Sequence, residues 1–218
     1  MVRTIKNPDE RKNEIMDVAN LLFYQKGYQH TTIEEIIKKA GIAKGTFYYY
    51  FKSKEEILDS IVKRAVAVTV NDTLKIASLD DIGAMEKLKL IFTEQSKNSD
   101  IASEEIENLH QLKNVDLHQK MIVETALQYA PVLGNVIKQG IDEGVFKTDY
   151  PDEVMEFIIV GMQFIFDPGI FKWTKKQFAQ RVSALIEMME NILNVEKGGF
   201  SYIMDLLLKC SLTPQTEI

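Results

Sequence analysis

Two glycines divide the first part of the chain into separate helices, and the second of these helices is very short. Gly27 ends an amphipathic segment that opens at Asn7, and Gly41 ends another that opens at Thr32. Asn7 is a favourable N-cap residue, and Thr32 and Glu35 have the spacing of a capping box. Because short helices are marginal in water, these segments must pack on one another or on a longer helix.

A third short helix is predicted over Lys44–Tyr50, where Phe47 and Phe51 stand four residues apart and can be buried together. Ser53 is a suitable N-cap for a long helix from Lys54 to about Val70. A helix of that length would be a lever of roughly 25 Å.

Helical periodicity continues to the end of the chain, and no segment alternates with the period of two that a strand requires. Further helices are expected at 83–97, 101–113, 115–140, 151–166, 175–195 and 199–210, and Pro131 should kink or split the third of these. The fold class is therefore all-α. We expect a three-helix domain at 1–53, joined by the long helix to a larger helical domain at 54–218.

The stretch from Thr32 to Glu55, which reads TIEEIIKKAGIAKGTFYYYFKSKE, resembles the helix-turn-helix signature of the TetR family of bacterial regulators. The resemblance is specific over residues 9–60, and beyond them it rests on length and helical pattern. It implies a helix-turn-helix DNA-binding domain at 1–53 and a helical ligand-binding and dimerisation domain at 54–218. Two short helices joined by a tight turn form the unit that places its second helix in the major groove. Ala43 departs from the family, which commonly has Ser or Thr there, so a side-chain cap is missing. Ile37 also departs, since Ala is frequent at its position.

By resemblance, the groove and base-edge candidates are Lys44, Gly45, Thr46, Tyr48 and Tyr49. Tyr50 and Lys54 would contact phosphates, and Thr32 would act both as cap and as phosphate contact. The run of tyrosines suits hydroxyls that reach phosphates and rings that lie against sugars or thymine methyl groups. Gly45 lets the backbone approach the groove closely.

Charge is distributed unevenly, although the whole chain carries a formal charge of −6. Residues 1–55 hold ten basic and seven acidic side chains, a balance of +3, and the rest holds sixteen and twenty-five, a balance of −9. A basic end on an acidic remainder predicts that only the first part meets DNA.

The remaining features favour a cytoplasmic regulator over other classes. We find no long apolar span, no signal segment, and a single cysteine, Cys210. No catalytic motif is present, so an enzyme is not expected. The alternative is an all-helical structural or protein-interaction bundle without sequence-specific DNA binding. Failure to bind DNA from its own upstream region, even at low salt, would favour that alternative.

The predicted partners are operator DNA, a second copy of the chain and a small-molecule effector, with no cofactor, metal or membrane. The resemblance implies a repressor released by its effector from a palindromic operator. Wide apolar stripes at 151–166 and 175–195 suggest burial on two sides, one of them against the second copy. They comprise Val154, Phe157, Ile158, Val160, Gly161 and Phe164, and Phe178, Val182, Leu185, Ile186, Met189 and Leu193.

The effector-pocket candidates are Phe92, His110, Met121, Met162, Phe166 and Trp173, large or polarisable groups on helices expected around the lever.

Overall fold

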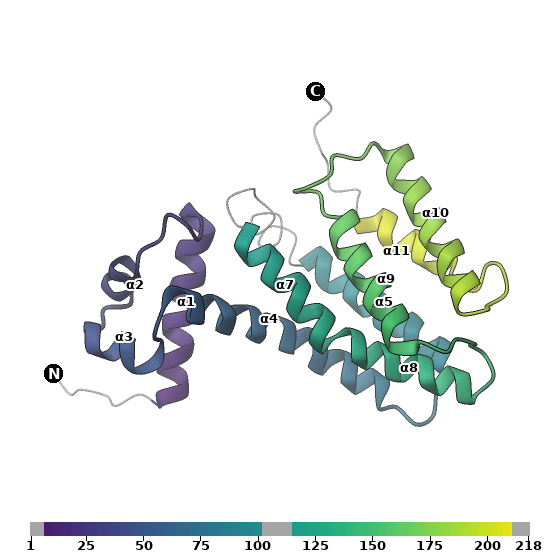
Figure 1. The fold of residues 1–218 in the computed structure, drawn as a ribbon, viewed down its shortest axis with the longest axis horizontal. Coiled ribbons are helices and arrows are strands. Elements are labelled where there is room, and N and C mark those ends of the chain that lie inside the picture. The colour runs from purple at the N-terminus through teal and green to yellow at the C-terminus, as the bar shows by residue number, and fades with distance from the viewer. Residues whose placement is uncertain (1–6, 102–114, 211–218) are drawn as a thin grey trace.

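The computed structural model describes residues 7–101 and 115–210, and every regular element within them is a helix (Figure 1). The all-α fold class is confirmed. The first four helices are α1 (Pro8–Lys26), α2 (Ile33–Ala40), α3 (Lys44–Tyr50) and α4 (Lys54–Ala77). They are followed by α5 (Ala84–Ile101), α7 (Val115–Gln128), α8 (Ala130–Asp142), α9 (Pro151–Ile165), α10 (Lys175–Ile192) and α11 (Tyr202–Cys210).

The predicted helix starts are confirmed at the level of individual hydrogen bonds. The side chain of Asn7 accepts from the backbone N–H of Asp9, and Ser53 accepts from Glu56. Thr32 and Glu35 form both halves of the capping box. Gly41 ends α2 in the left-handed conformation with a φ of 62°, which glycine adopts without strain.

Helix α4 is longer than the sequence predicts. α4 continues to Ala77, so the lever is about 36 Å long at the usual helical rise of about 1.5 Å per residue. The predicted break in the segment 115–140 is confirmed. The segment is split at Tyr129 into α7 and α8, two residues before Pro131, which cannot donate an interior backbone hydrogen bond. The helix predicted at 101–113 lies outside the described residues.

Two hydrophobic cores are built along α4. We call the first the head core; it joins α1, α2, α3 and the first turns of α4, and its buried members are Ile15, Met16, Ala19, Leu22, Phe23, Ile36, Phe47, Phe51, Ile57, Leu58, Ile61, Val62, Val66 and Leu117. The second, the body core, joins α5 with α8 to α11. Val70 of α4 packs against both. In Figure 1 the head, α1 to α3, lies at the left, and α4 crosses to the body at the right.

Close packing in the body depends on glycines in α8. A Cβ added at Gly140 would lie 2.1 Å from Cδ2 of the buried Phe146, and one at Gly134 would lie 3.1 Å from Cα of Asp152. Both distances are shorter than van der Waals contact, so only glycine allows α8 to approach α9 and the following loop this closely. Among the described helices, we find none long and apolar enough to cross a membrane.

Candidate nucleic-acid interface

Helix α3 is held against the head by its aromatic residues on one side. Phe47 is fully buried and Phe51, just after the helix, is 1% exposed, with ring centroids 6.1 Å apart. Burial of each ring contributes on the order of 1.5–3 kcal/mol to the free energy of folding. This contribution stabilises α3, which is too short to be stable alone. The opposite side of α3 is free to meet a ligand.

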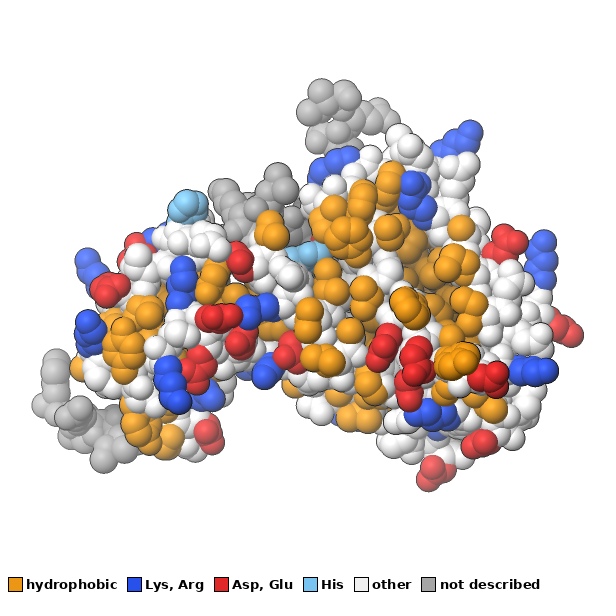
Figure 2. Space-filling view, viewed as in Figure 1, with side chains coloured by type: hydrophobic (Ala, Val, Ile, Leu, Met, Phe, Trp, Pro, Cys, Tyr) orange, Lys and Arg blue, Asp and Glu red, His pale blue; other side chains and the backbone are white. Residues whose placement is uncertain are grey.

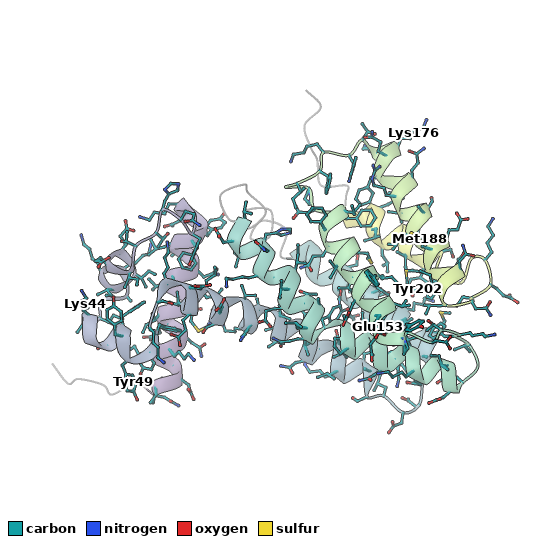
Figure 3. All side chains as sticks on the ribbon, viewed as in Figure 1. Lys44, Tyr49, Glu153, Lys176, Met188 and Tyr202 are labelled. Atoms are coloured by element: carbon teal, nitrogen blue, oxygen red, sulfur yellow. The ribbon has the colours of Figure 1, made fainter. Side chains whose placement is uncertain are left out.

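The predicted recognition residues divide into an exposed and a half-buried group. Lys44, Gly45, Tyr48 and Tyr49 are exposed, and Tyr49 has 78% of its surface accessible. Thr46 and Tyr50 are half-buried, and Tyr50 packs against the head core. Figure 3 shows Lys44 and Tyr49 at the end of the molecule farthest from the body.

The start of α3 has no side-chain cap, as the presence of Ala43 predicts. The first backbone N–H groups of α3 therefore have no partner from the N-cap side chain. Backbone N–H groups at a helix start can donate to phosphate oxygens, so the missing cap is compatible with a position against DNA.

Lys54 is used inside the head. Its Nζ donates to the carbonyl oxygens of Tyr28 at 2.7 Å and Thr31 at 2.9 Å, with a longer contact of 3.4 Å to Gln29. The ammonium also lies 4.3 Å from the centre of the Tyr28 ring. Partial burial lowers the pKa of Lys54. This lysine therefore ties the α1–α2 loop to α4, and its predicted phosphate contact stays a prediction.

Thr32 caps α2 and lies within an ionic cluster. Its hydroxyl accepts from the backbone N–H of Glu35 at 3.3 Å and lies 3.0 Å from the Glu35 carboxylate. Lys26 donates to the same carboxylate. The hydrogen bond from Lys26, followed by those from Thr32, lowers the pKa of Glu35 to about 2. Thr32 remains exposed, so its second role at a phosphate also stays a prediction.

The effector candidates do not form one cluster. Phe92 is buried in the body core, and Met162 and Phe166 pack against it. Trp173 lies in the link before α10, where its indole N–H donates to the carbonyl of Ile165 at 2.8 Å. Met121 packs instead against the head core. His110 lies outside the described residues.

Open grooves do not coincide with these candidates either. One groove of about 380 Å³ runs between α1 and α4, and another of about 370 Å³ runs between α4 and α7. Neither is lined by any of the six predicted effector residues. The assignment of the effector pocket therefore stays a prediction.

Sequence reasoning missed a polar cluster inside the body. Gln95 donates its side-chain amide to the Tyr129 hydroxyl, and Thr73 of α4 hydrogen-bonds to the same tyrosine. Burial raises the pKa of Tyr129 to about 12. A threonine and a glutamine on the apolar sides of α4 and α5 were the available signal. The cluster joins the end of the lever to α5 and to the α7–α8 junction.

A second missed contact joins α7 to the link after α9. His118 Nε2 lies 2.6 Å from Asp167 Oδ2, and the backbone N–H of Gly169 donates to Asp167 Oδ1 at 2.6 Å. No local pattern in the sequence reveals this contact, because the two residues are far apart in the chain.

Comparison with known proteins agrees with this geometry. A family model described as bacterial regulatory proteins, tetR family, matches residues 15–61, and one described as tetracyclin repressor-like, C-terminal domain, matches 97–188. The fatty acid metabolism regulator protein of Bacillus subtilis is 30% identical over 138 residues, which cover 62% of this chain and 70% of that protein. The chain belongs to the TetR family. It is a DNA-binding transcriptional regulator, as its relatives are.

A further curated relative and two solved structures are also similar to this chain. The HTH-type transcriptional repressor KstR2 of Rhodococcus jostii is 26% identical over 66% of this chain and 72% of its own length. The structure of FadR from Bacillus subtilis in complex with stearoyl-CoA has a TM-score of 0.56 at 23% identity, covering 91% of this chain and 96% of that one. FadR from Bacillus halodurans gives 0.59 at 19% identity, covering 97% and 99%. These structures share the fold.

Proposed function

We propose that the chain is a dimeric repressor that reads a palindromic operator with α3. The observation that carries the proposal is the exposed face of Lys44, Tyr48 and Tyr49 on a helix whose other side is anchored by Phe47. A lysine and tyrosine hydroxyls can donate to base edges and phosphates, and the tyrosine rings can lie against sugars. Lys44 Nζ lies 6.0 Å from the centre of the Tyr48 ring, so the two side chains form one surface.

The test begins with an operator selected by the purified protein from a pool of randomised duplexes. Lys44→Ala and Tyr49→Ala should each weaken binding to it by about 1–3 kcal/mol if they contact bases. Lys75→Ala and Tyr150→Ala are matched controls, because both side chains are exposed and lie away from α3. Equal affinity in both recognition variants and the controls would refute this face as the reader.

The dimer contact proposed for α9 and α10 is supported by apolar side chains that the body leaves exposed. Phe157 and Phe164 of α9 are 81% and 41% exposed, and Met188 and Ile192 of α10 are 55% and 41% exposed. Phe157 and Phe164 are seven residues apart and share a side of α9, as do Met188 and Ile192 on α10. Figure 2 shows apolar side chains over this side of the body. A two-fold contact of two helices from each copy would cover them.

The effector is proposed to bind in the body, beside the second half of α4. Phe92, Met162 and Phe166 of the body core supply apolar groups, Trp173 in the link before α10 supplies another, and Tyr129 supplies a polar one. Because a regulator of the same fold has been solved with stearoyl-CoA, a long-chain acyl-CoA is the first ligand to test. Movement of α4 by the ligand would change the separation of the two recognition helices. His110 and Met121 remain in this proposal as secondary candidates.

Thermal denaturation with stearoyl-CoA, and with free CoA as the control, tests this assignment. A ligand that binds only the folded protein raises its melting temperature. Reciprocity then requires that the operator weaken effector binding by the same factor by which the effector weakens operator binding. Equal acyl-CoA affinity with and without the operator would show that it is not the effector. We also propose that the DNA-binding domain ends at residue 53 and that the second domain begins at residue 54. We further propose that the protein acts in the cytoplasm and is not an enzyme.

A further inference from the structure

Helix α7 comes long after α4 in the sequence, yet the first half of α7 packs on the head. Leu117 is 3% exposed and is a member of the head core, and Met121 packs against that core one turn later. Asp116 accepts a hydrogen bond of 2.8 Å from the side-chain amide of Gln29, in the loop between α1 and α2. The head is therefore attached to the body through α7 as well as through α4.

Charged side chains of α7 face charges of opposite sign on α4. Lys120 Nζ lies 2.6 Å from Asp59 Oδ1 and 3.3 Å from Glu55 Oε1. One turn later, Glu124 Oε1 lies 3.8 Å from Lys63 Nζ. The charged positions are spaced four residues apart on each helix, so each set lies along one side of its helix. The two sets match in only one register.

The apolar contacts and the charged pairs of α7 have different effects on how the head is held. Burial of Leu117 holds α7 on the head, but the hydrophobic effect has no preferred direction. The charged pairs border the open groove between α4 and α7, and partly exposed pairs of this kind add little to stability. The complementary charges instead fix the register of α7 along α4 and the orientation of the two helices. Lys120 is central because it bridges Asp59 and Glu55.

We propose that Lys120 is a positioning residue for DNA binding: its contacts with Asp59 and Glu55 set the angle of the head on the body. In the dimer, that angle sets the distance between the two recognition helices. The inference rests on the proposed function, since this distance matters only to a dimer that binds two half-sites. A shift of α7 along its axis would release the head without bending α4.

The test uses the full chain and the operator selected by the wild-type protein. Affinities are measured for that duplex, for duplexes with the half-site spacing lengthened or shortened by a single base pair, and for a single half-site. The wild type should lose about tenfold or more in affinity on either change of spacing. Lys120→Glu places a carboxylate against Asp59 and Glu55, so its preference should flatten to about threefold or less, while half-site affinity is unchanged.

Two further variants sharpen the test. Combining Lys120→Glu with Asp59→Lys restores an opposite-charge pair and should restore the spacing preference. Lys75→Glu makes the same change of charge on α4, at a lysine whose partner is Asp72 of the same helix, and should keep the wild-type profile. If Lys120→Glu does not give a folded dimer, Lys120→Gln removes the ion pairs without repulsion and should flatten the profile in the same direction.

The outcomes separate this inference from the proposed function. A sharp spacing preference in folded Lys120→Glu or Lys120→Gln overturns the positioning role. So does an equal flattening in Lys75→Glu, or an equal loss of half-site and full-operator affinity. If the wild-type protein selects no operator at all, the proposed function itself fails.

Discussion

Gly45 offers a substitution that separates folding from DNA recognition. Among the described residues, an added Cβ there meets no heavy atom within 4 Å beyond its own chain neighbours and helix backbone. Alanine is up to about 1 kcal/mol more favourable than glycine within a helix. We therefore expect Gly45→Ala to unfold at the wild-type temperature or about 2–4 °C higher.

On DNA the same methyl group should be harmful. If the backbone of α3 approaches the groove at Gly45, the methyl group occupies space that the base edges need, and overpacking of a close contact costs about 1–3 kcal/mol. That corresponds to a loss of about 5- to 150-fold in operator affinity, since about 1.4 kcal/mol is tenfold. Fluorescence anisotropy with the selected operator measures this loss, and thermal denaturation measures stability.

Gly140→Ala is the converse control. Its Cβ would meet the buried ring of Phe146 at 2.1 Å, so it should lower stability by about 1–3 kcal/mol while the folded protein binds the operator normally. Wild-type operator affinity in Gly45→Ala would refute the close approach of α3 at this residue. A lower melting temperature in Gly45→Ala would refute the conclusion that the position is sterically open.

Lys54→Met removes a charged donor from the α1–α2 loop and should lower the free energy of unfolding by about 1.5–3 kcal/mol, measured by urea denaturation. If Lys54 also contacts a phosphate, the slope of log affinity against log salt should fall by about 1. The hydrogen bond from Lys26 lowers the pKa of Glu35 to about 2, so the ionised carboxylate stabilises the fold above pH 4.5 and loses this effect as the pH falls toward 2. Glu35→Gln should accordingly melt below the wild type at neutral pH, and the difference should disappear near pH 2 in a pH series of melting curves. Light scattering should give about twice the chain mass of 25.0 kDa for the wild type, and Phe157→Glu should give the single-chain mass.

Local sequence was sufficient for the elements of the head. Asn7, Thr32 with Glu35, and Ser53 mark helix starts through hydrogen bonds to backbone groups two or three residues away. Gly41 marks a helix end through its own left-handed conformation. Such signals act within one turn of chain, so reading the sequence in order finds them. The burial of Phe47 and Phe51 followed from their four-residue spacing at the end of one short helix.

Local sequence was insufficient wherever the site depends on partners that are distant in the chain. Lys54 was expected at a phosphate, but its ammonium donates to the carbonyls of Tyr28 and Thr31, and no local pattern reveals which loop returns to that position. Met121 was placed in the effector pocket because it is large and apolar, and the packing of α7 puts it against the head core. A helical stripe shows that a side is buried without showing against what.

The sequence by itself determined the helices of the head, their caps, the all-α class and the exposed face of α3 that we propose reads DNA, because periodicity and capping are properties of neighbouring residues. Only the tertiary structure decided that Leu117 of α7 joins the head core, that Lys120 meets Asp59 and Glu55, and that Thr73, Gln95 and Tyr129 share one buried cluster. Hydrophobic burial is non-directional, and each helix could satisfy its apolar side against several others. The choice among those pairings is made by all the helices packing together at once.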